Sequence, residues 1–343
     1  MATIITGAAA VARTPVAASK GTSTVSKGGG YVFYSDNPEA VDAGDLADAG
    51  KWLNRDTVTG AGLVYLWHHN VSGASLQHTL TIYNPNSFAI RVSTNNYGLT
   101  NHASNSDVAA WQEYFTWKPT LSIVINPLSY GQLFPARTIA AGNNFGILGQ
   151  INITNNATSA AASAVLFDLA WVSNSSGATA FANIKSPTMR RGKAPTYYNT
   201  INFAPLSPTD TNGVYYSIAG STSYPGIFGT DDIPYVTDPS GAVSGLLYGG
   251  YGQQYYINMT IRNTTGTARK FRVFLGRTTG FYIFPIVNMG GSTVRASGWT
   301  SGGTYVDMIE TNTIPHNGTE TFSFYTVIPA ISTTPLRIGA RTI

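Results

Sequence analysis

LTIYN, residues 80–84, recurs far along the chain as MTIRN, residues 259–263. Each copy leads through a short polar turn into a second matching segment, AIRV at residues 89–92 and KFRV at residues 270–273. Short apolar segments that end at polar turns are typical of β-strands. The repeat therefore predicts two related β-domains in one chain.

A third landmark follows in each half of the chain. Thr138 begins the segment TIAAG in the first half, and Thr313 begins TIPHNG in the second. The distance from Thr81 to Thr138 is 57 residues, and the distance from Thr260 to Thr313 is 53. Because three landmarks keep their order and nearly keep their spacing, we expect Thr81 and Thr260 to lie on equivalent strands.

The rest of the sequence also has the pattern of a β-protein. From residue 62 onward, short apolar segments are separated by Gly, Asn, Pro or Ser at the spacing of a sandwich or barrel. Residues 319–328 alternate almost perfectly, and residues 111–117 are also predicted to form a strand. One helix is predicted near residue 40, with Pro38 in its first turn. The fold class is all-β: two tandem antiparallel β-sandwiches, immunoglobulin-like or jelly-roll-like, with an N-terminal arm and one short helix.

These segments divide the chain into four parts. Residues 1–57 are predicted to form an extended arm followed by a short strand and the helix. The first sandwich is expected over residues 58–180, a proline-containing linker over 181–213, and the second sandwich over 214–343.

The composition limits the classes of function. Charged residues make up only 10% of the 343 residues, against roughly 25% in typical soluble proteins. The net charge of +4 rests on scattered basic residues, so we expect no nucleic-acid partner. Neither a membrane span nor a secretory signal is expected, and the chain has no cysteine. A neutral polar surface repels other copies only weakly, which favours self-association.

The arm is the first candidate site. Residues 1–30 are small, nearly uncharged and β-permissive, and end in three glycines. We expect the arm to pair with the open sheet edge of another copy and to hold an assembly together. Its apolar anchors would be Ile4, Ile5, Val11 and Val16.

Two further clusters are candidates for ligand contacts. Asp36, Asp42, Asp45 and Asp48 could bind a cation weakly, although an ordinary acidic helix face explains them as well. Tyr248, Tyr251 and Tyr255 could form an aromatic contact for a carbohydrate or a protein, although tyrosines filling a sandwich edge explain that pattern equally.

No catalytic constellation emerges from the remaining polar residues. His68, His69 and His78 lack a nearby carboxylate in sequence and are interpreted as strand-surface residues rather than as a metal centre. Asp168 lies within a predicted strand, where we expect it to bond a strand end or an arginine. We therefore expect no enzyme activity, no cofactor and no small-molecule substrate. Seven Asn-x-Ser/Thr sequons matter only if the protein is glycosylated, at Asn70, Asn152, Asn156, Asn174, Asn258, Asn263 and Asn317.

The repeated segments resemble immunoglobulin-like sandwich modules of bacterial, Gram-positive-type surface and envelope proteins. The resemblance is carried by LTIYNPNSFAIRV and MTIRNTTGTARKFRV, followed by TIAAGNNFG and TIPHNGTETFSF. In such modules an N-P or N-T-T turn joins two strands, and a T-I-P-x-G turn opens the last ones. The resemblance implies an extracellular location, but it carries over no binding or catalytic residue.

Together these observations predict a non-enzymatic structural protein that assembles with other copies of itself. The expected assembly is an extracellular surface layer, fibre or appendage. A virion component such as a capsid or tail protein is the alternative, because tandem sandwiches with an N-terminal arm also suit a virion. A carbohydrate- or host-binding adhesin is the third possibility.

Overall fold

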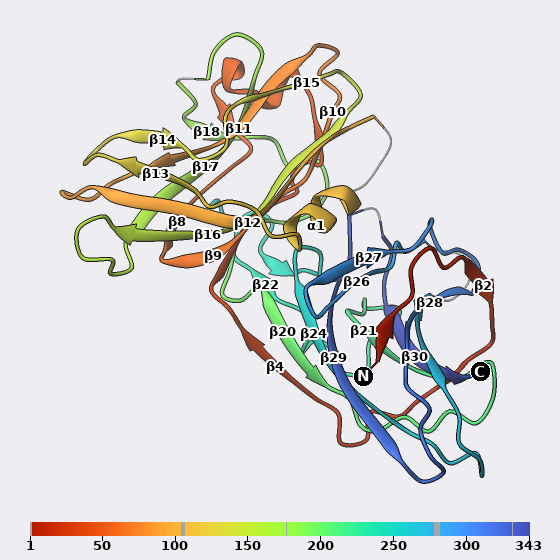
Figure 1. The fold of residues 1–343 in the computed structure, drawn as a ribbon. Coiled ribbons are helices and arrows are strands. Elements are labelled where there is room, and N and C mark those ends of the chain that lie inside the picture. The colour runs from red at the N-terminus through yellow and green to blue at the C-terminus, as the bar shows by residue number, and fades with distance from the viewer. Residues whose placement is uncertain (1, 104–106, 176, 278–281, 331) are drawn as a thin grey trace. The chain divides into compact units, whose positions relative to one another are not determined.

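The computed structural model describes residues 2–103, 107–175, 177–277, 282–330 and 332–343. Two compact units make up the chain (Figure 1). The first sandwich comprises residues 29–197 and 235–247, and the second comprises the arm up to Gly28 with residues 198–234 and 248–343. Strands dominate both units, so the predicted all-β class is confirmed.

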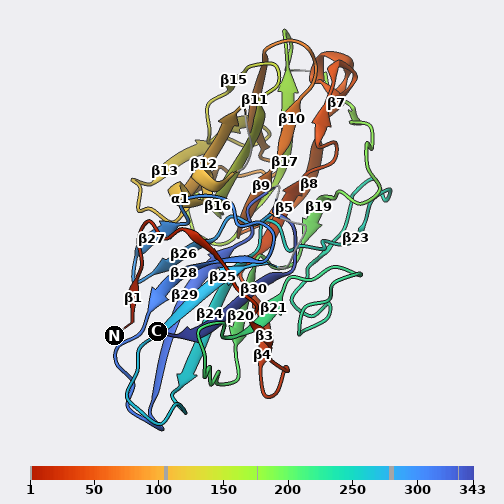
Figure 2. The ribbon, with the colours of Figure 1, turned by 90° about the vertical axis from the view of Figure 1, so that its right-hand side faces the viewer.

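The first sandwich has two main sheets, which form its two layers (Figure 2). The eight-stranded sheet contains β13 (Leu121–Ile125), β12 (Ile90–His102), β16 (Asn144–Asn155), β9 (Ala61–Leu66), β5 (Tyr31–Ser35), β19 (Arg191–Ala194), β10 (His68–Asn70) and β6 (Ala40–Val41). The five-stranded sheet contains β14 (Tyr130–Gln132), β11 (Leu76–Tyr83), β17 (Ser163–Trp171), β8 (Asn54–Thr59) and β15 (Arg137–Ile139). Two small pairs flank them, β7 (Lys51–Trp52) with β18 (Ala180–Phe181) and β22 (Tyr235–Val236) with β23 (Gly245–Leu246).

The second sandwich also has two sheets. The seven-stranded sheet contains β1 (Thr3–Ile4), β2 (Ala10–Ala12), β28 (Thr304–Glu310), β25 (Phe271–Gly276), β30 (Leu336–Thr342), β21 (Val214–Ile218) and β3 (Val16–Ala17). The six-stranded sheet contains β27 (Ser292–Arg295), β26 (Ile286–Met289), β29 (Thr319–Val327), β24 (Gln254–Arg262), β20 (Tyr198–Asn202) and β4 (Thr24–Gly28).

Each unit encloses its own core between its two sheets. In the first sandwich, Leu80 and Ile82 of β11 pack toward Ile151 and Ile153 of β16. In the second, alternate residues of β24 face those of β25 and β30 in the same way. Burying one side of each strand in this manner produces the alternation seen in the sequence.

The sheets are mixed rather than purely antiparallel. β5 runs parallel to β9, and β20 runs parallel to β24. Parallel neighbours need a long crossover. Residues 36–60 supply the crossover of the first sandwich, and part of it, β8, joins the opposite sheet. The expectation of antiparallel sandwiches is therefore correct for most pairs and wrong for these.

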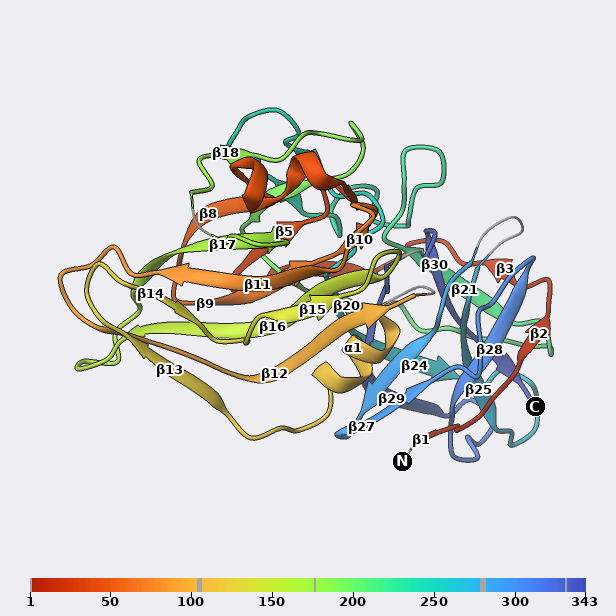
Figure 3. The ribbon, with the colours of Figure 1, turned by 90° about the horizontal axis from the view of Figure 1, so that it is seen from above.

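Helices do not lie where they were predicted. The stretch after Pro38 forms two 3-10 turns, η1 (Ala43–Asp45) and η2 (Ala47–Ala49), in place of one helix. The single α-helix within the described ranges is α1 (Val108–Tyr114), where a strand was expected; it lies against β12 (Figure 3). Val108, Trp111 and Tyr114 are buried and recur at i, i+3 and i+6, which is the period of a helix and not of the strand predicted over residues 111–117.

The arm is part of the second sandwich and does not precede the first as a separate part (Figure 1). β1 and β2 pair with β28 at one edge of the seven-stranded sheet, and β3 pairs with β21 at the other. The arm thus pairs with open sheet edges of its own chain, whereas the sequence predicted pairing with the sheet edge of another copy. Ile4 and Ile5 are half-buried, whereas Val11 and Val16 are exposed and do not serve as buried anchors.

The strands that carry the repeat occupy corresponding places. β11 and β24 are each followed directly by an asparagine, Asn84 or Asn263, after which the chain crosses to the opposite sheet as β12 or β25. After the hairpin of β12 with β13, β14 pairs with β11 and places Gln132 opposite Thr81; after the pair of β25 with β28, β29 pairs with β24 and places Thr321 opposite Thr260. Thr81 and Thr260 therefore lie on topologically equivalent strands.

The third landmark is not equivalent in the two halves. In the second half, the carbonyl of Ile314 accepts a 2.7 Å hydrogen bond from the asparagine that ends β24. In the first half, the asparagine that ends β11 donates instead to Ile125, at 3.0 Å. Ile139 is bonded by an earlier asparagine, Asn70, so the segments TIAAG and TIPHNG were matched wrongly. Short turns of this kind recur at several strand ends, and spacing alone does not tell them apart.

Three buried asparagines, Asn70, Asn84 and Asn263, fasten these crossings, and all three are fully buried. At Asn263, the side-chain amide donates to the carbonyls of Thr267 and Ile314, both at 2.7 Å. Its oxygen accepts from the backbone N–H of Thr265 at 3.0 Å and from the hydroxyl of that residue at 2.8 Å. One side chain thereby closes the turn and joins it to the facing loop.

We predict that Asn263→Ala lowers the free energy of unfolding of the second sandwich by about 1–3 kcal/mol, because the carbonyls of Thr267 and Ile314 and the N–H of Thr265 each lose a hydrogen bond. Urea unfolding followed by far-UV circular dichroism measures the change. Asn156→Ala is the matched control, since Asn156 is exposed. Equal stability of the two variants would contradict the role of the buried carboxamide.

Candidate binding cleft

The outer face of the five-stranded sheet of the first sandwich carries a row of aromatic rings. Phe167 on β17 faces outward, as does Thr81, which lies opposite it on β11. The ring of Tyr130 on β14 lies 6.1 Å from that of Phe167 and 4.8 Å from that of Tyr83, measured between centroids. Tyr130 is 65% exposed, so the row opens to solvent.

Trp52 on β7 extends the row at its other end. Its ring packs edge-on against Phe167 and Phe181, at 5.7 and 5.8 Å. The guanidinium of Arg55 lies 5.3 Å from the centroid of the Trp52 ring and 5.4 Å from that of Phe167. These cation–π contacts hold both rings in fixed orientations.

A loop after β17 forms one wall of the cleft. The carboxylate of Asp48 accepts hydrogen bonds from the backbone N–H groups of Ser173 and Asn174, at 2.9 and 2.8 Å, and from the hydroxyl of Ser173 at 2.6 Å. Although burial acts to raise the pKa of Asp48, these hydrogen bonds outweigh it and lower the pKa. The loop is thereby tied to η2 by a charged acceptor.

The cleft between these groups has a volume of ≈ 350 Å³, within the usual range for small-ligand sites. Thr81, Gln132 and Ser175 add neutral hydroxyl and amide groups to the aromatic walls. The full lining is Trp52, Thr81, Tyr130, Gln132, Phe167, Leu169, Ser175, Gly177 and Ala178. Such a lining can stack a ring and hydrogen-bond a neutral ligand.

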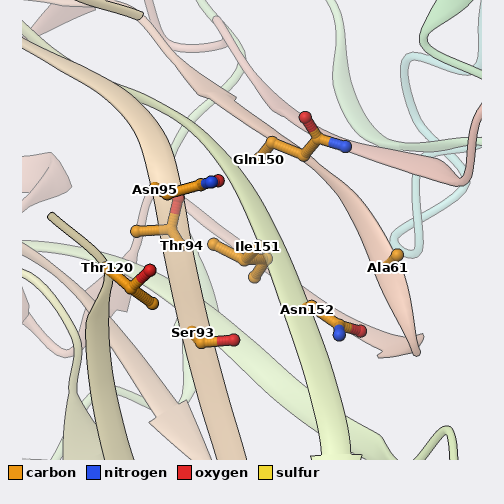
Figure 4. Close-up of a pocket in the computed structure, with 8 residues that line it drawn as sticks. All are labelled: Ala61, Ser93, Thr94, Asn95, Thr120, Gln150, Ile151 and Asn152. Atoms are coloured by element: carbon orange, nitrogen blue, oxygen red, sulfur yellow. The ribbon is translucent and has the colours of Figure 1, made fainter. Parts of the chain in front are cut away.

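A second cavity, of ≈ 310 Å³, lies on the eight-stranded sheet beside an irregularity in β12 between Ser93 and Asn96. Figure 4 shows Ile151 between Thr94 and Asn152. The side-chain amide of Gln150 is already bonded, to the hydroxyls of Tyr114 and Tyr197. With no aromatic wall and no charged group in its lining, this cavity is the weaker candidate. Its lining is Ala61, Ser93, Thr94, Asn95, Thr120, Gln150, Ile151 and Asn152.

Asp168 lies on the inner side of β17 and joins two histidines. Its two oxygens lie 2.8 Å from His68 Nε2 and 2.9 Å from His78 Nε2, and all three side chains are fully buried. Burial acts to raise the pKa of Asp168, but the charge and hydrogen bonds of the histidines outweigh it and hold the pKa well below its usual range. The expected arginine partner is therefore wrong, as is the placement of His68 and His78 on the surface.

The hydrogen bonds define the protonation of this cluster. His68 Nδ1 lies 2.7 Å from the carbonyl oxygen of Pro38, which only accepts, and Nε2 faces the ionised Asp168. Both nitrogens of His68 must therefore donate, which makes it an imidazolium. Burial lowers the pKa of His78, which favours a neutral ring there. The cluster is thus a buried ion pair with a neutral third member, and it is closed to any substrate.

The proposed cation site does not form. Asp42 and Asp45 share the ammonium of Lys185, at 2.6 and 3.2 Å, and Asp48 binds the loop described above. Asp36 is buried and accepts from Tyr34. Within the ranges that the structure describes, no group of three or more His, Cys, Asp or Glu is arranged to hold a metal ion.

The predicted tyrosine contact does not form either. Tyr255 is fully buried in the core of the second sandwich, and the hydroxyl of Tyr251 donates to the carbonyl of Ser332. Tyr248 is half-buried. The aromatic row around Phe167 was missed. The sequence feature that indicates this row is the nearly unbroken apolar run AVLFDLAW at residues 164–171, because such a run is typical of a strand with side chains covered on both faces.

Comparisons with known proteins assign no family. No family model matches the sequence, and no curated protein matches it. An insecticidal delta-endotoxin from Bacillus thuringiensis is 10% identical with a TM-score of 0.20; 76% of this chain is covered, and the chain spans about half (54%) of the endotoxin. The CUB1-EGF-CUB2 region of human MASP-1/3 is 9% identical with a TM-score of 0.18, covering 81% of this chain and 99% of that one. No helix in the described ranges is long and apolar enough to cross a membrane.

We predict that Asp168→Asn lowers the free energy of unfolding by about 3–5 kcal/mol, because it leaves the imidazolium of His68 buried without its counter-ion. Denaturant unfolding measures the loss. Asp231→Asn, which changes an exposed aspartate, is the control and should be nearly neutral. A small loss at Asp168 would contradict the ion-pair assignment.

We also predict that His78 contributes stability that is lost on acidification through the ordinary histidine pKa of 6.5. Since the pKa of His78 is lowered in the fold, this side chain is protonated more readily in the unfolded chain, and its contribution to stability is fully present only above that pH. The lowered pKa of Asp168 adds a second loss near and below its ordinary pKa of 3.8. His78→Gln should remove the first step, measured as the unfolding free energy between pH 8 and pH 5. Replacing the exposed His102 by Gln should leave that step unchanged.

Proposed function

We propose that this protein is a non-enzymatic structural protein whose copies associate by exchanging their N-terminal arms. The assembly would be an extracellular surface layer, fibre or appendage. The observation that carries the proposal is the arm itself, which occupies both edges of the seven-stranded sheet.

The arm is held mainly through its backbone. β2 and β3 bury almost no side chain, and Val11 and Val16 are 50% and 66% exposed. Its side-chain anchors include the ion pair between Arg13 and Asp307, at 2.9 Å, and the buried Ala2. All of these contacts can be remade with an identical neighbour at no loss, which is the condition for domain swapping.

The hinge for such an exchange lies between β3 and β4. Residues 18–23 connect these strands, and Gly21 has a φ of +51°. β4 pairs with β20 over five residues, and Val25 packs against the core. We therefore expect residues 2–17 to exchange and β4 to remain in place.

The sparse charge of the chain favours the assembled state. Only 36 residues are acidic or basic, counting 20 Lys and Arg and 16 Asp and Glu. Repulsion between copies is correspondingly weak. Val11 on β2 and Val16 on β3 are exposed at the two edges of the sheet, and contact between copies would cover them.

A cysteine pair tests the exchange, because the chain has no native cysteine. Ala12 and Thr304 are direct cross-strand partners, so Ala12→Cys with Thr304→Cys places two thiols at a bridging position. If arms exchange, oxidation after assembly gives covalent multimers on a non-reducing gel. Oxidation of dilute monomer should close the bridge within one chain and block assembly.

Deletion of residues 2–17 is a second, independent test of the exchange. The truncated chain should stay monomeric by light scattering while it keeps a β-type circular dichroism spectrum. Assembly by the truncated chain, or by the chain locked within one molecule, would overturn the proposal.

A further inference from the structure

We propose that the aromatic cleft on the first sandwich binds a neutral pyranose-based glycan. The cleft is independent of the arm, which belongs to the second sandwich. It also differs from the tyrosine cluster expected from the sequence, which is buried.

The aromatic walls supply the first half of the recognition. The C–H face of a pyranose ring stacks on an aromatic face, and Tyr130, Phe167 and Trp52 present a row of rings 5.7 to 6.1 Å apart. The ring of Tyr130 is 65% exposed, yet the neighbouring Tyr83 and Phe167 fix it from two sides. A fixed, exposed ring loses little entropy on binding, which makes it an efficient contact.

The polar groups supply the second half. Gln132 and Thr81 lie opposite each other on β14 and β11, so their amide and hydroxyl stand beside the aromatic row. Ser175 adds a hydroxyl from the facing loop, which Asp48 anchors at residues 173 and 174. Amide and hydroxyl groups match the equatorial hydroxyls of a sugar, which both donate and accept.

The charge of the cleft selects neutral glycans over acidic ones. None of its lining side chains is charged. The guanidinium of Arg55, which does not line the cleft, lies over the rings of Trp52 and Phe167. A carboxylated sugar would have to draw Arg55 away from both rings, whereas a neutral sugar leaves the cation–π contacts in place.

Isothermal titration of the whole chain tests the proposal. The probes are cellohexaose, xylohexaose, mannohexaose and chitohexaose as neutral glycans and hexagalacturonate as an acidic one. We expect saturable binding of at least one neutral hexaose in the micromolar to millimolar range. Tyr130→Ala should weaken it about tenfold, which corresponds to about 1.4 kcal/mol and lies within the usual contribution of one stacked ring. Gln132→Ala should weaken it independently.

Tyr235→Ala is the matched control, because Tyr235 is a 54% exposed tyrosine on the same unit but outside the cleft. Both Tyr130 and Gln132 are exposed, so their variants should fold, and circular dichroism verifies this. Binding of none of the neutral hexaoses at millimolar concentration would overturn the proposal. So would binding of hexagalacturonate alone, or neutral binding that survives both cleft substitutions.

Discussion

The sandwiches depend on how the chain crosses from one sheet to the other without leaving buried backbone groups unpaired. At each crossing built on Asn70, Asn84 or Asn263, one carboxamide donates to carbonyls of its own turn and of the facing loop, and its oxygen accepts from the turn. An unsatisfied buried carbonyl costs on the order of 1–3 kcal/mol, so these side chains decide where a strand can end. Register follows, since a slip of one residue would move the asparagine to the wrong face.

This interaction explains both the success and the error of sequence-based prediction. LTIYN and MTIRN recur because each strand must end in the same asparagine, and that repeat correctly identified equivalent strands. The sequons at Asn70 and Asn263 have the same origin, because the hydroxyl two residues later bonds the asparagine oxygen. Both asparagines are buried, so the pattern records a turn and not a glycosylation site in the folded protein. The Thr-Ile landmark failed because several loops offer such a carbonyl.

The sequence could not predict which side chains of β17 face the core and which face outward, and the reason is physical. In residues 164–171 nearly every side chain is apolar, so alternation cannot assign an inner and an outer side. The structure turns Asp168 inward to His68 and His78 and turns Phe167 outward to the cleft. Partners separated by 90 or 100 residues form that cluster, and no local pattern marks such pairs. The parallel pairing of β5 with β9 was missed for the same reason.

β17 therefore links the stability of the first sandwich to the shape of its cleft. Asp168 is held on the inner side by hydrogen bonds with His68 and His78. The adjacent Phe167 is held on the outer side by contacts with Trp52 and Arg55. Because successive side chains of a strand point to opposite faces, fixing one residue fixes the direction of the next. The cleft is consequently shaped before any ligand arrives, and the ordering cost of binding there is small. The buried pair of Asp168 and His68 thus supports the outward position of Phe167 without itself lining the cleft.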